Sequence, residues 1–189
     1  MARLVLGLDS STQSLSAVVL NLDDRRAVAD LSINFEKALP QYGARDGTLR
    51  SADPTVVHAP PLMWVEALDL LFSQLVKAGV AMRDIVAVSG SGQQHGSVYL
   101  TADAPARLAQ LNAAQPLAAQ LSGIFSRATS PIWMDSSTTA ECAEITASLG
   151  GAAAVAEATG SAAFERFTGP QIRKFAKTEP DAYGKTAHI

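Results

Sequence analysis

The sequence has almost no cysteine, the residue that forms disulfides and thiolate metal sites. Cys142 is the single cysteine among 189 residues, so an internal disulfide and a cysteine-based metal cage are both excluded. A chain that uses cysteine so sparingly fits a reducing compartment. We therefore expect a cytoplasmic protein.

Charge and long apolar runs are also scarce. Charged residues make up 17% of the chain and the formal net charge is -3, which leaves no basic footprint for nucleic acid or an anionic membrane. No window is long and apolar enough for a membrane span. The apolar start is interrupted by Asp9 and further polar residues too early for a signal peptide. We expect neither a nucleic-acid nor a membrane partner.

What is present predicts one α/β domain. Apolar runs at 4–8, 15–20 and 27–35 predict three consecutive antiparallel strands. Asp53-Pro54 predicts the start of a short helix, followed after Pro60-Pro61 by a longer helix that ends at Ala78-Gly79. The continuous apolar run 84–89 predicts a strand buried on both faces.

The second half of the chain reads as short helices with one strand among them. Two helices are expected between 104 and 125, one ending at Leu149, one at 152–158 and one from Pro170. The run 131–135 predicts a short strand that ends in the carboxylate Asp135, after which Ser and Thr residues can cap a helix.

The segment Gly7 to Ser14 offers a carboxylate and several hydroxyls between two strands. A strand that ends in Asp9, followed by a turn with outward N–H and hydroxyl groups, can hold a phosphate chain through magnesium. The alternative is a hairpin whose Asp and Ser side chains only cap the turn. These residues alone leave both interpretations open.

A second polar loop, Ser89 to Tyr99, follows the predicted buried strand, at the sheet edge where α/β proteins place ligands. It fits neither a nucleophile elbow, which needs Gly where Ser89 stands, nor a dinucleotide fingerprint, which needs Gly where His95 stands. The loop presents Gln93, Gln94 and His95, which suit a polyol. The alternative is that His95 satisfies a buried carbonyl.

Four blocks taken together resemble the FGGY carbohydrate kinases. They are Gly7–Ser14, Ser89–Tyr99, Pro131–Thr139 and Thr159–Ile172, in the order in which that family has them. The resemblance implies an α/β, actin-like or ribonuclease-H-like domain, a mixed sheet with helices on both faces. It also implies transfer of the ATP γ-phosphoryl group to a ketose, with D-xylulose, giving D-xylulose 5-phosphate, as the first expectation.

The same resemblance implies roles for particular residues. Asp9 is expected near magnesium, and Ser10, Ser11, Thr12 and Gln13 at the ATP phosphates. His95 and Arg166 are expected to hold sugar hydroxyls, with Gln94, Trp133 and Asp135 as further members of the motif blocks.

The resemblance covers residues 3–189 but only the amino-terminal part of those longer kinases. The family's catalytic Asp base and its carboxy-terminal nucleotide-binding domain have no counterpart here. We therefore expect an incomplete sugar-side domain that is inactive alone. Alternatives are a non-catalytic actin-like sugar- or nucleotide-binding module and an actin- or chaperone-type ATPase domain, although the latter gives no reason for the Gln-Gln-His-Gly run. The sequence does not settle the oligomeric state, for which a homodimer is one option.

Overall fold

A four-stranded mixed sheet forms one half of the protein, whose computed structural model describes residues 2–189. The described chain has six strands in all, which are β1 (Leu4–Ser10), β2 (Ser14–Asn21), β3 (Arg26–Asn34), β4 (His58–Ala59), β5 (Ile85–Gly92) and β6 (Ser130–Pro131). The sheet order is β3-β2-β1-β5, in which β5 is parallel to β1 and the other pairs are antiparallel. β4 and β6 form a separate antiparallel pair. The predicted antiparallel start and the mixed sheet are confirmed.

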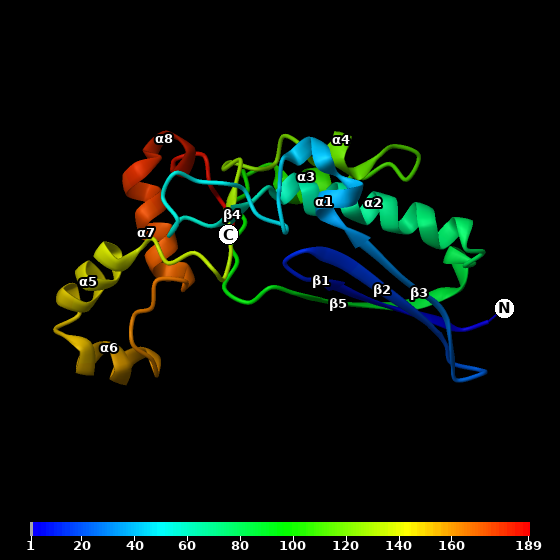
Figure 1. Ribbon diagram of the computed structural model, residues 1–189, viewed down its shortest axis with the longest axis horizontal. Coiled ribbons are helices and arrows are strands. Elements are labelled where there is room, and N and C mark those ends of the chain that lie inside the picture. The colour runs from blue at the N-terminus through cyan, green and yellow to red at the C-terminus, as the bar shows by residue number, and fades with distance from the viewer. Residues whose placement is uncertain (1) are drawn as a thin grey trace.

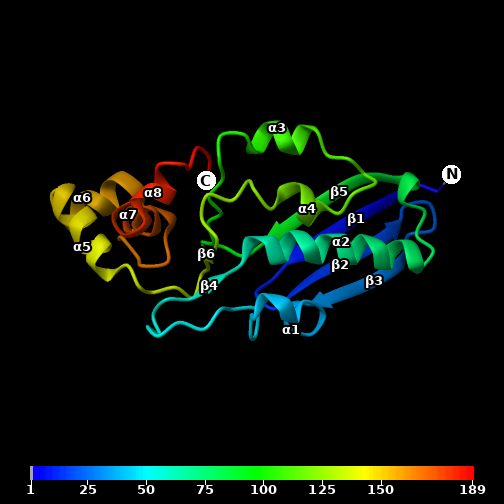
Figure 2. The ribbon, with the colours of Figure 1, turned by 90° about the horizontal axis from the view of Figure 1, so that it is seen from above.

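The helices fall into two groups (Figure 1 and Figure 2). Beside the sheet lie α1 (Phe35–Ala38), α2 (Pro61–Lys77), α3 (Ala104–Ala109) and α4 (Leu117–Leu121), with short 3-10 turns at Pro40–Tyr42 and Met82–Asp84. The second group contains α5 (Thr139–Ser148), α6 (Ala152–Thr159), α7 (Thr168–Thr178) and α8 (Pro180–Tyr183). Within residues 2–189, no helix has both the length and the apolar character needed to span a bilayer.

The long helix α2 supplies the main cover of the sheet. Its residues Met63, Ala67, Leu71 and Leu75 recur every fourth position and are fully buried. This spacing puts them on one face of a helix, where burying each large side chain contributes about 1.5–3 kcal/mol. The helix stops before Gly79, whose φ of +84° favours glycine. Its predicted end is confirmed.

The predicted first helix at Asp53-Pro54 is wrong. Asp53 instead closes a local turn, in which its carboxylate accepts the Thr55 N–H at 2.8 Å. The chain then extends into β4, and Pro60, which precedes Pro61, is restricted to extended backbone. A helix can therefore begin only at Pro61.

The two faces of the four-stranded sheet differ in cover. Leu6, Leu15 and Val19 face α2 and are at most 5% exposed, whereas Val18 and Leu20 on the opposite face are 37% and 42% exposed. Figure 1 shows the neighbouring helices on the α2 side of the sheet. In the described part of the chain, helices thus cover one face and not the expected two.

Strand β5 is the least covered strand. Val86 and Val88 are 62% and 61% exposed, and no strand within residues 2–189 pairs with the outer edge of β5. The expectation that this strand is buried on both faces is therefore wrong for the described chain. An apolar run shows what a strand can bury but not whether anything covers it.

Candidate active site

A cavity of about 450 Å³ opens where β1 and β5 end. These two strands are parallel neighbours with Ser10 opposite Gly92, so their carboxyl ends meet at the same sheet edge. The cavity is lined by Asp9, Ser10, Ser11, Thr12, Gly92, Gln93, Gln94, His95, Trp133 and Arg166. Residues of all four sequence blocks that resemble the kinases therefore meet in one place.

Asp9 stands exposed near the end of β1. It is paired in register with Ser91 of β5, whose hydroxyl donates to Asp9 Oδ1. Among the described residues, no group of three or more His, Cys, Asp or Glu side chains could hold a metal ion. A single carboxylate suits magnesium, which commonly takes one or two protein carboxylates and completes its shell with water and phosphate oxygens.

The turn after β1 makes part of the capping pattern that the alternative interpretation predicts. Both the backbone N–H and the hydroxyl of Ser11 donate to the carbonyl of Ser14, at 2.9 and 3.0 Å. Thr12 is not used in this way, because its hydroxyl accepts a hydrogen bond from Trp133 Nε1 at 3.0 Å. The turn is thus capped from within and also tied to the 131–137 segment.

A neighbouring loop fixes the shape of this turn from outside. Gly47 has a φ of +80°, and a Cβ added to it would lie 1.8 Å from the carbonyl oxygen of Thr12. Only glycine can occupy this position without moving the turn. Gln13 does not line the 450 Å³ cavity but a neighbouring one of about 580 Å³, which Ser11 and Thr12 also line.

The loop after β5 brings two amides and an imidazole to the cavity. Gln93 Nε2 donates to the carbonyl of Ser11 at 3.3 Å, which joins this loop to the first turn. His95 has a φ of +59°, unusual for a residue other than glycine, and its ring stacks on Phe167 at 4.9 Å. Within residues 2–189 the His95 ring makes no hydrogen bond, so it does not satisfy a buried carbonyl as the alternative predicted.

Arg166 reaches the cavity from the segment before α7. Its side chain is exposed and forms no ion pair with any residue between 2 and 189. Phe167, the next residue, stacks on His95. The stack therefore places the His95 ring against the chain segment that carries Arg166.

Sequence reasoning missed the supporting residues Ser91 and Phe167. Ser91 could have been found from the register, because parallel strands place it opposite Asp9. No local pattern marks Phe167 as the partner of His95, since their contact depends on how the α7 segment folds back onto the sheet edge.

Asp135, another member of the motif blocks, lies outside the cavity. It is 1% exposed, and the expected strand at 131–135 is limited to Ser130–Pro131. Asp135 accepts hydrogen bonds from Ser137 and Gln171 and faces His58 at 3.3 Å. Burial opposes its charge, but the hydrogen bonds from His58, Ser137 and Gln171 outweigh burial and hold the pKa of its carboxyl well below the usual range.

Comparison with known sequences identifies the relatives of this chain. It is 47% identical over 189 residues to xylulose kinase 2 of Arabidopsis thaliana and 43% identical over 187 residues to xylulose kinase of Mus musculus, covering 98% and 99% of this chain. The chain is homologous to the xylulose kinases. It spans about a third of the length of these relatives, 33% and 34% respectively. No protein-family model matches it.

Solved structures of xylulose kinases and other sugar kinases share the fold. Xylulose kinase from Rhodospirillum rubrum superimposes with a TM-score of 0.70 at 21% identity, covering 98% of this chain and 31% of that one. Plasmodium falciparum glycerol kinase with ADP gives a TM-score of 0.65 at 16% identity, covering 97% of this chain and 30% of the other. The resemblance to FGGY carbohydrate kinases and the predicted α/β fold with a mixed sheet are confirmed, whereas the helices expected on both faces cover one face of the described chain.

Proposed function

We propose that this chain is the sugar-side part of an ATP-dependent kinase that phosphorylates a ketose, D-xylulose first, to its 5-phosphate. One observation carries the proposal. Side chains from all four motif blocks line a single cavity at the ends of β1 and β5, in a chain 47% identical to a plant xylulose kinase.

In this proposal the cavity has a sugar side and a phosphate side. His95, Arg166 and Gln94 hold ketose hydroxyls. The imidazole and guanidinium make no hydrogen bond or ion pair with other residues of the 2–189 range, so both are available to a ligand. Ligand binding takes these two groups out of water, which is favourable only when the ligand replaces the hydrogen bonds that they made to water.

On the phosphate side, Ser10, Ser11, Thr12 and Gln13 bind ATP phosphate oxygens and Asp9 holds magnesium. The backbone N–H groups of Thr12 and Gln13 form no hydrogen bond within the described chain, so they can donate to an anion. Bound magnesium would neutralise the charge of the phosphates during transfer. Asp9 is exposed, accepts one side-chain hydrogen bond and lines the same cavity as Thr12, which fits that role.

The cavity has no second carboxylate to accept the proton of the attacking hydroxyl. Asp9 is the only acid among its lining residues, and Asp135 is buried and fully hydrogen-bonded. We infer that the base comes from a part of the protein outside residues 1–189, together with the nucleotide pocket. By itself the chain would bind ligands weakly and turn over none.

The uncovered surfaces support an incomplete domain. The outer edge of β5 has no partner strand within residues 2–189, and an apolar hollow of about 350 Å³ lies beside it, lined by Leu8, Trp64, Leu68 and Phe125 among others. Bare apolar patches of this kind ordinarily have a partner. We propose that the remaining length of the protein covers them.

We further propose that the protein works in the cytoplasm, which its single cysteine supports, and on small-molecule partners only. A homodimer is one option for the assembled protein. Size-exclusion chromatography with light scattering on the intact gene product gives the oligomeric state directly.

A coupled ADP-release assay tests the function. The intact gene product, assayed with ATP and magnesium against a panel of ketoses, should show turnover that depends on D-xylulose at roughly 1–100 per second. Residues 1–189 alone should show none. An intact product longer than this chain that releases no ADP with any ketose would contradict the kinase assignment, and ketose-dependent turnover by residues 1–189 alone would place the base within them.

The coding DNA beyond Ile189 separates the kinase from the non-catalytic module. A reading frame that continues through a second domain supports the kinase. A natural stop after Ile189, with sugar binding and no turnover, supports the binding module.

A further inference from the structure

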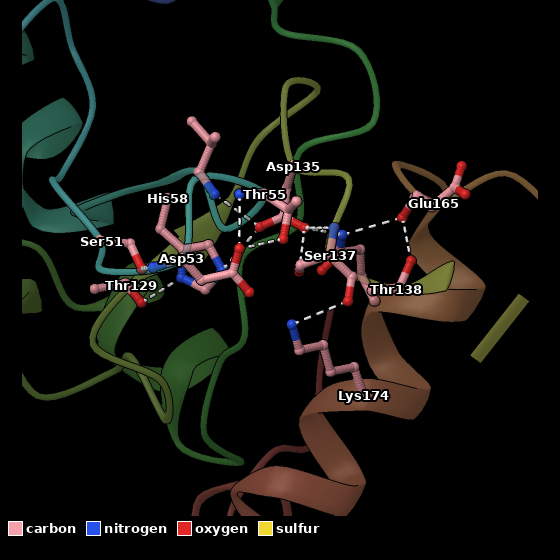
Figure 3. A network of polar contacts seen from close by, with 12 residues as sticks. Ser51, Asp53, Thr55, His58, Thr129, Asp135, Ser137, Thr138, Glu165 and Lys174 are labelled. Atoms are coloured by element: carbon pink, nitrogen blue, oxygen red, sulfur yellow. Dashed lines mark hydrogen bonds and ion pairs between the residues drawn. The ribbon is translucent and has the colours of Figure 1, made fainter. Parts of the chain in front are cut away.

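Asp135 joins three segments of the chain that are far apart in sequence (Figure 3). Its Oδ2 accepts the N–H of Val57, just before β4, at 2.9 Å and lies 3.3 Å from Nε2 of His58, the first residue of β4. Its Oδ1 accepts the N–H and hydroxyl of Ser137, at 3.0 and 2.6 Å. Gln171 Nε2 of α7 donates to the same oxygen at 2.7 Å. One buried carboxylate therefore serves donors from all three segments.

Two of these segments carry cavity residues. Trp133 precedes Asp135 by two positions and reaches the cavity, where its Nε1 bonds Thr12. On the α7 side, Gln171 Nε2 also donates to the carbonyl of Glu165 at 3.1 Å. Arg166 follows directly and also lines the cavity.

A second contact reinforces this connection. The hydroxyl of Thr138 donates to the same Glu165 carbonyl at 2.6 Å, and it forms no side-chain cap of α5, although Thr138 occupies the cap position. Figure 3 shows the two bonds converging on Glu165. The backbone before Arg166 is thus held by two donors that belong to, or are bonded to, the Asp135 turn.

No Lys or Arg lies within ion-pair distance of the Asp135 carboxylate in the described chain, and the nearby Lys174 bonds the Ser137 carbonyl instead. The charge is stabilised by four hydrogen bonds, from the Val57 N–H, the Ser137 N–H and hydroxyl and the Gln171 amide, and by the nearby His58 ring. Each of the four hydrogen bonds requires the carboxylate oxygens in a fixed place. Such a network specifies one arrangement, because any shift leaves a buried donor without a partner.

We propose that Asp135 is a positioning residue that holds the segments of Trp133 and Arg166 in place at the ligand cavity. It does not line the cavity and acts through the 131–137 turn and through Gln171. This inference rests on the proposed function for its kinetic consequence, though not for its structural one. Loss of the carboxylate loosens the segment of Glu165 and the 131–137 turn together, so the sugar side loses its geometry. The turn after β1 loses at most the bond from Trp133 to Thr12 and is still held by Ser11 and Gly47.

Two variants and one control test this on the intact gene product. Asp135→Asn removes the charge at constant size. Gln171→Met keeps the charge and removes the bonds from α7 to Asp135 and to the Glu165 carbonyl, which keeps the test usable if the first variant folds poorly. Glu141→Gln is the control, because Glu141 is also a buried carboxylate bonded to α7, through Lys177, but has no link to the cavity. Each is assayed for ketose KM, ATP KM and kcat, and amide hydrogen exchange is measured by mass spectrometry.

Both test variants should raise the ketose KM by roughly tenfold and leave the ATP KM within about twofold, as expected when a buried hydrogen-bond partner is lost. Exchange should quicken at 132–134 and 165–168 but not in β1 or β2. Glu141→Gln should change none of these. Equal effects on both substrates, or unchanged exchange at 165–168, would overturn the proposal.

If the wild-type protein phosphorylates no ketose, the proposed function fails on its own account. The exchange data then decide the positioning role alone. Quicker exchange of both segments in the test variants supports it, and quicker exchange at 132–134 only overturns it.

Discussion

The same four residues, Asp-Ser-Ser-Thr, occur at 9–12 and at 135–138, with opposite outcomes. Asp9 is exposed in the cavity and accepts one side-chain hydrogen bond, from Ser91. Asp135 is buried, with its two oxygens fully used. The difference arises from where each tetrapeptide lies. The first ends a sheet strand at an open edge, whereas the second lies between β4 and α7.

A carboxylate is available to a ligand where the fold places few hydrogen-bond donors around it. Asp135 is surrounded by N–H and O–H groups, so a cation would have to compete with all of them. Asp9 has unused acceptor capacity and lines the same cavity as Thr12, whose backbone N–H forms no hydrogen bond within residues 2–189. The following predictions test this contrast, and each compares the two sites or their immediate supports.

The largest effect is expected from Asp9→Asn. The change keeps the size and removes the charge that would hold magnesium, so kcat of the intact gene product should fall by about 10²–10³. Thermal unfolding should hardly change, because Asp9 is exposed. Unchanged turnover at saturating magnesium would show that Asp9 does not hold the metal.

Asp135→Asn should reverse this pattern and mainly cost stability. An amide cannot accept all the donors that the carboxylate serves, so the free energy of unfolding should fall by about 3 kcal/mol. Urea denaturation measures it. Glu141→Gln, which weakens one partly exposed ion pair, should cost less.

The pH dependence of that loss has a definite sign. The pKa of Asp135 is lowered in the folded protein, so its charge stabilises the fold above the unfolded pKa of about 3.9. This contribution is lost as the pH falls through the lowered folded pKa. The gap in stability between wild type and Asp135→Asn should therefore be constant from about pH 7 to 5 and shrink below about pH 4. A gap that widens in acid would contradict the sign.

His95→Ala sharpens the contrast at the sugar side of the Asp9 cavity. Loss of the hydrogen bond between the imidazole and a ketose hydroxyl should weaken ketose binding by about 1–3 kcal/mol, with ATP affinity nearly unchanged. Isothermal calorimetry on the intact product measures both. Equal loss of both ligands would mean that His95 serves the fold through its stack on Phe167.

The smallest effects are expected from the serines that bond the two carboxylates. Ser137→Ala removes a donor from the buried Asp135 and should cost about 1 kcal/mol of unfolding free energy. Ser91→Ala removes the exposed donor to Asp9 and should cost less than about 0.5 kcal/mol. Similar costs for both would indicate that Asp9 is as enclosed as Asp135 in solution.

Most of the fold and the gathering of the cavity could be predicted from the sequence. The apolar runs of β1 and β2 and the apolar residue at every fourth position of α2 are local sequence patterns, and packing agrees with them. His95 and Asp9 could be expected together once both followed strands of one sheet. The helix expected at Asp53 is wrong because an Asp-Pro pair begins turns as well as helices.

What could not be predicted depends on distant contacts. Nothing in the Ser-Ser-Thr context of Asp135 distinguishes it from that of Asp9, since its burial comes from Val57, His58 and Gln171. The exposure of Val86 and Val88 likewise depends on cover that no local pattern reports.

The open edge of β5 bears directly on how this chain behaves at high concentration. Along this eight-residue strand, the N–H and C=O groups that point away from β1 have no strand partner within residues 2–189. They form a template onto which a strand of a second copy can add. The apolar Val86 and Val88 on that strand make such association more favourable. We therefore expect residues 1–189, expressed alone, to self-associate through β5, and a charged Val88→Lys variant to be the more soluble preparation.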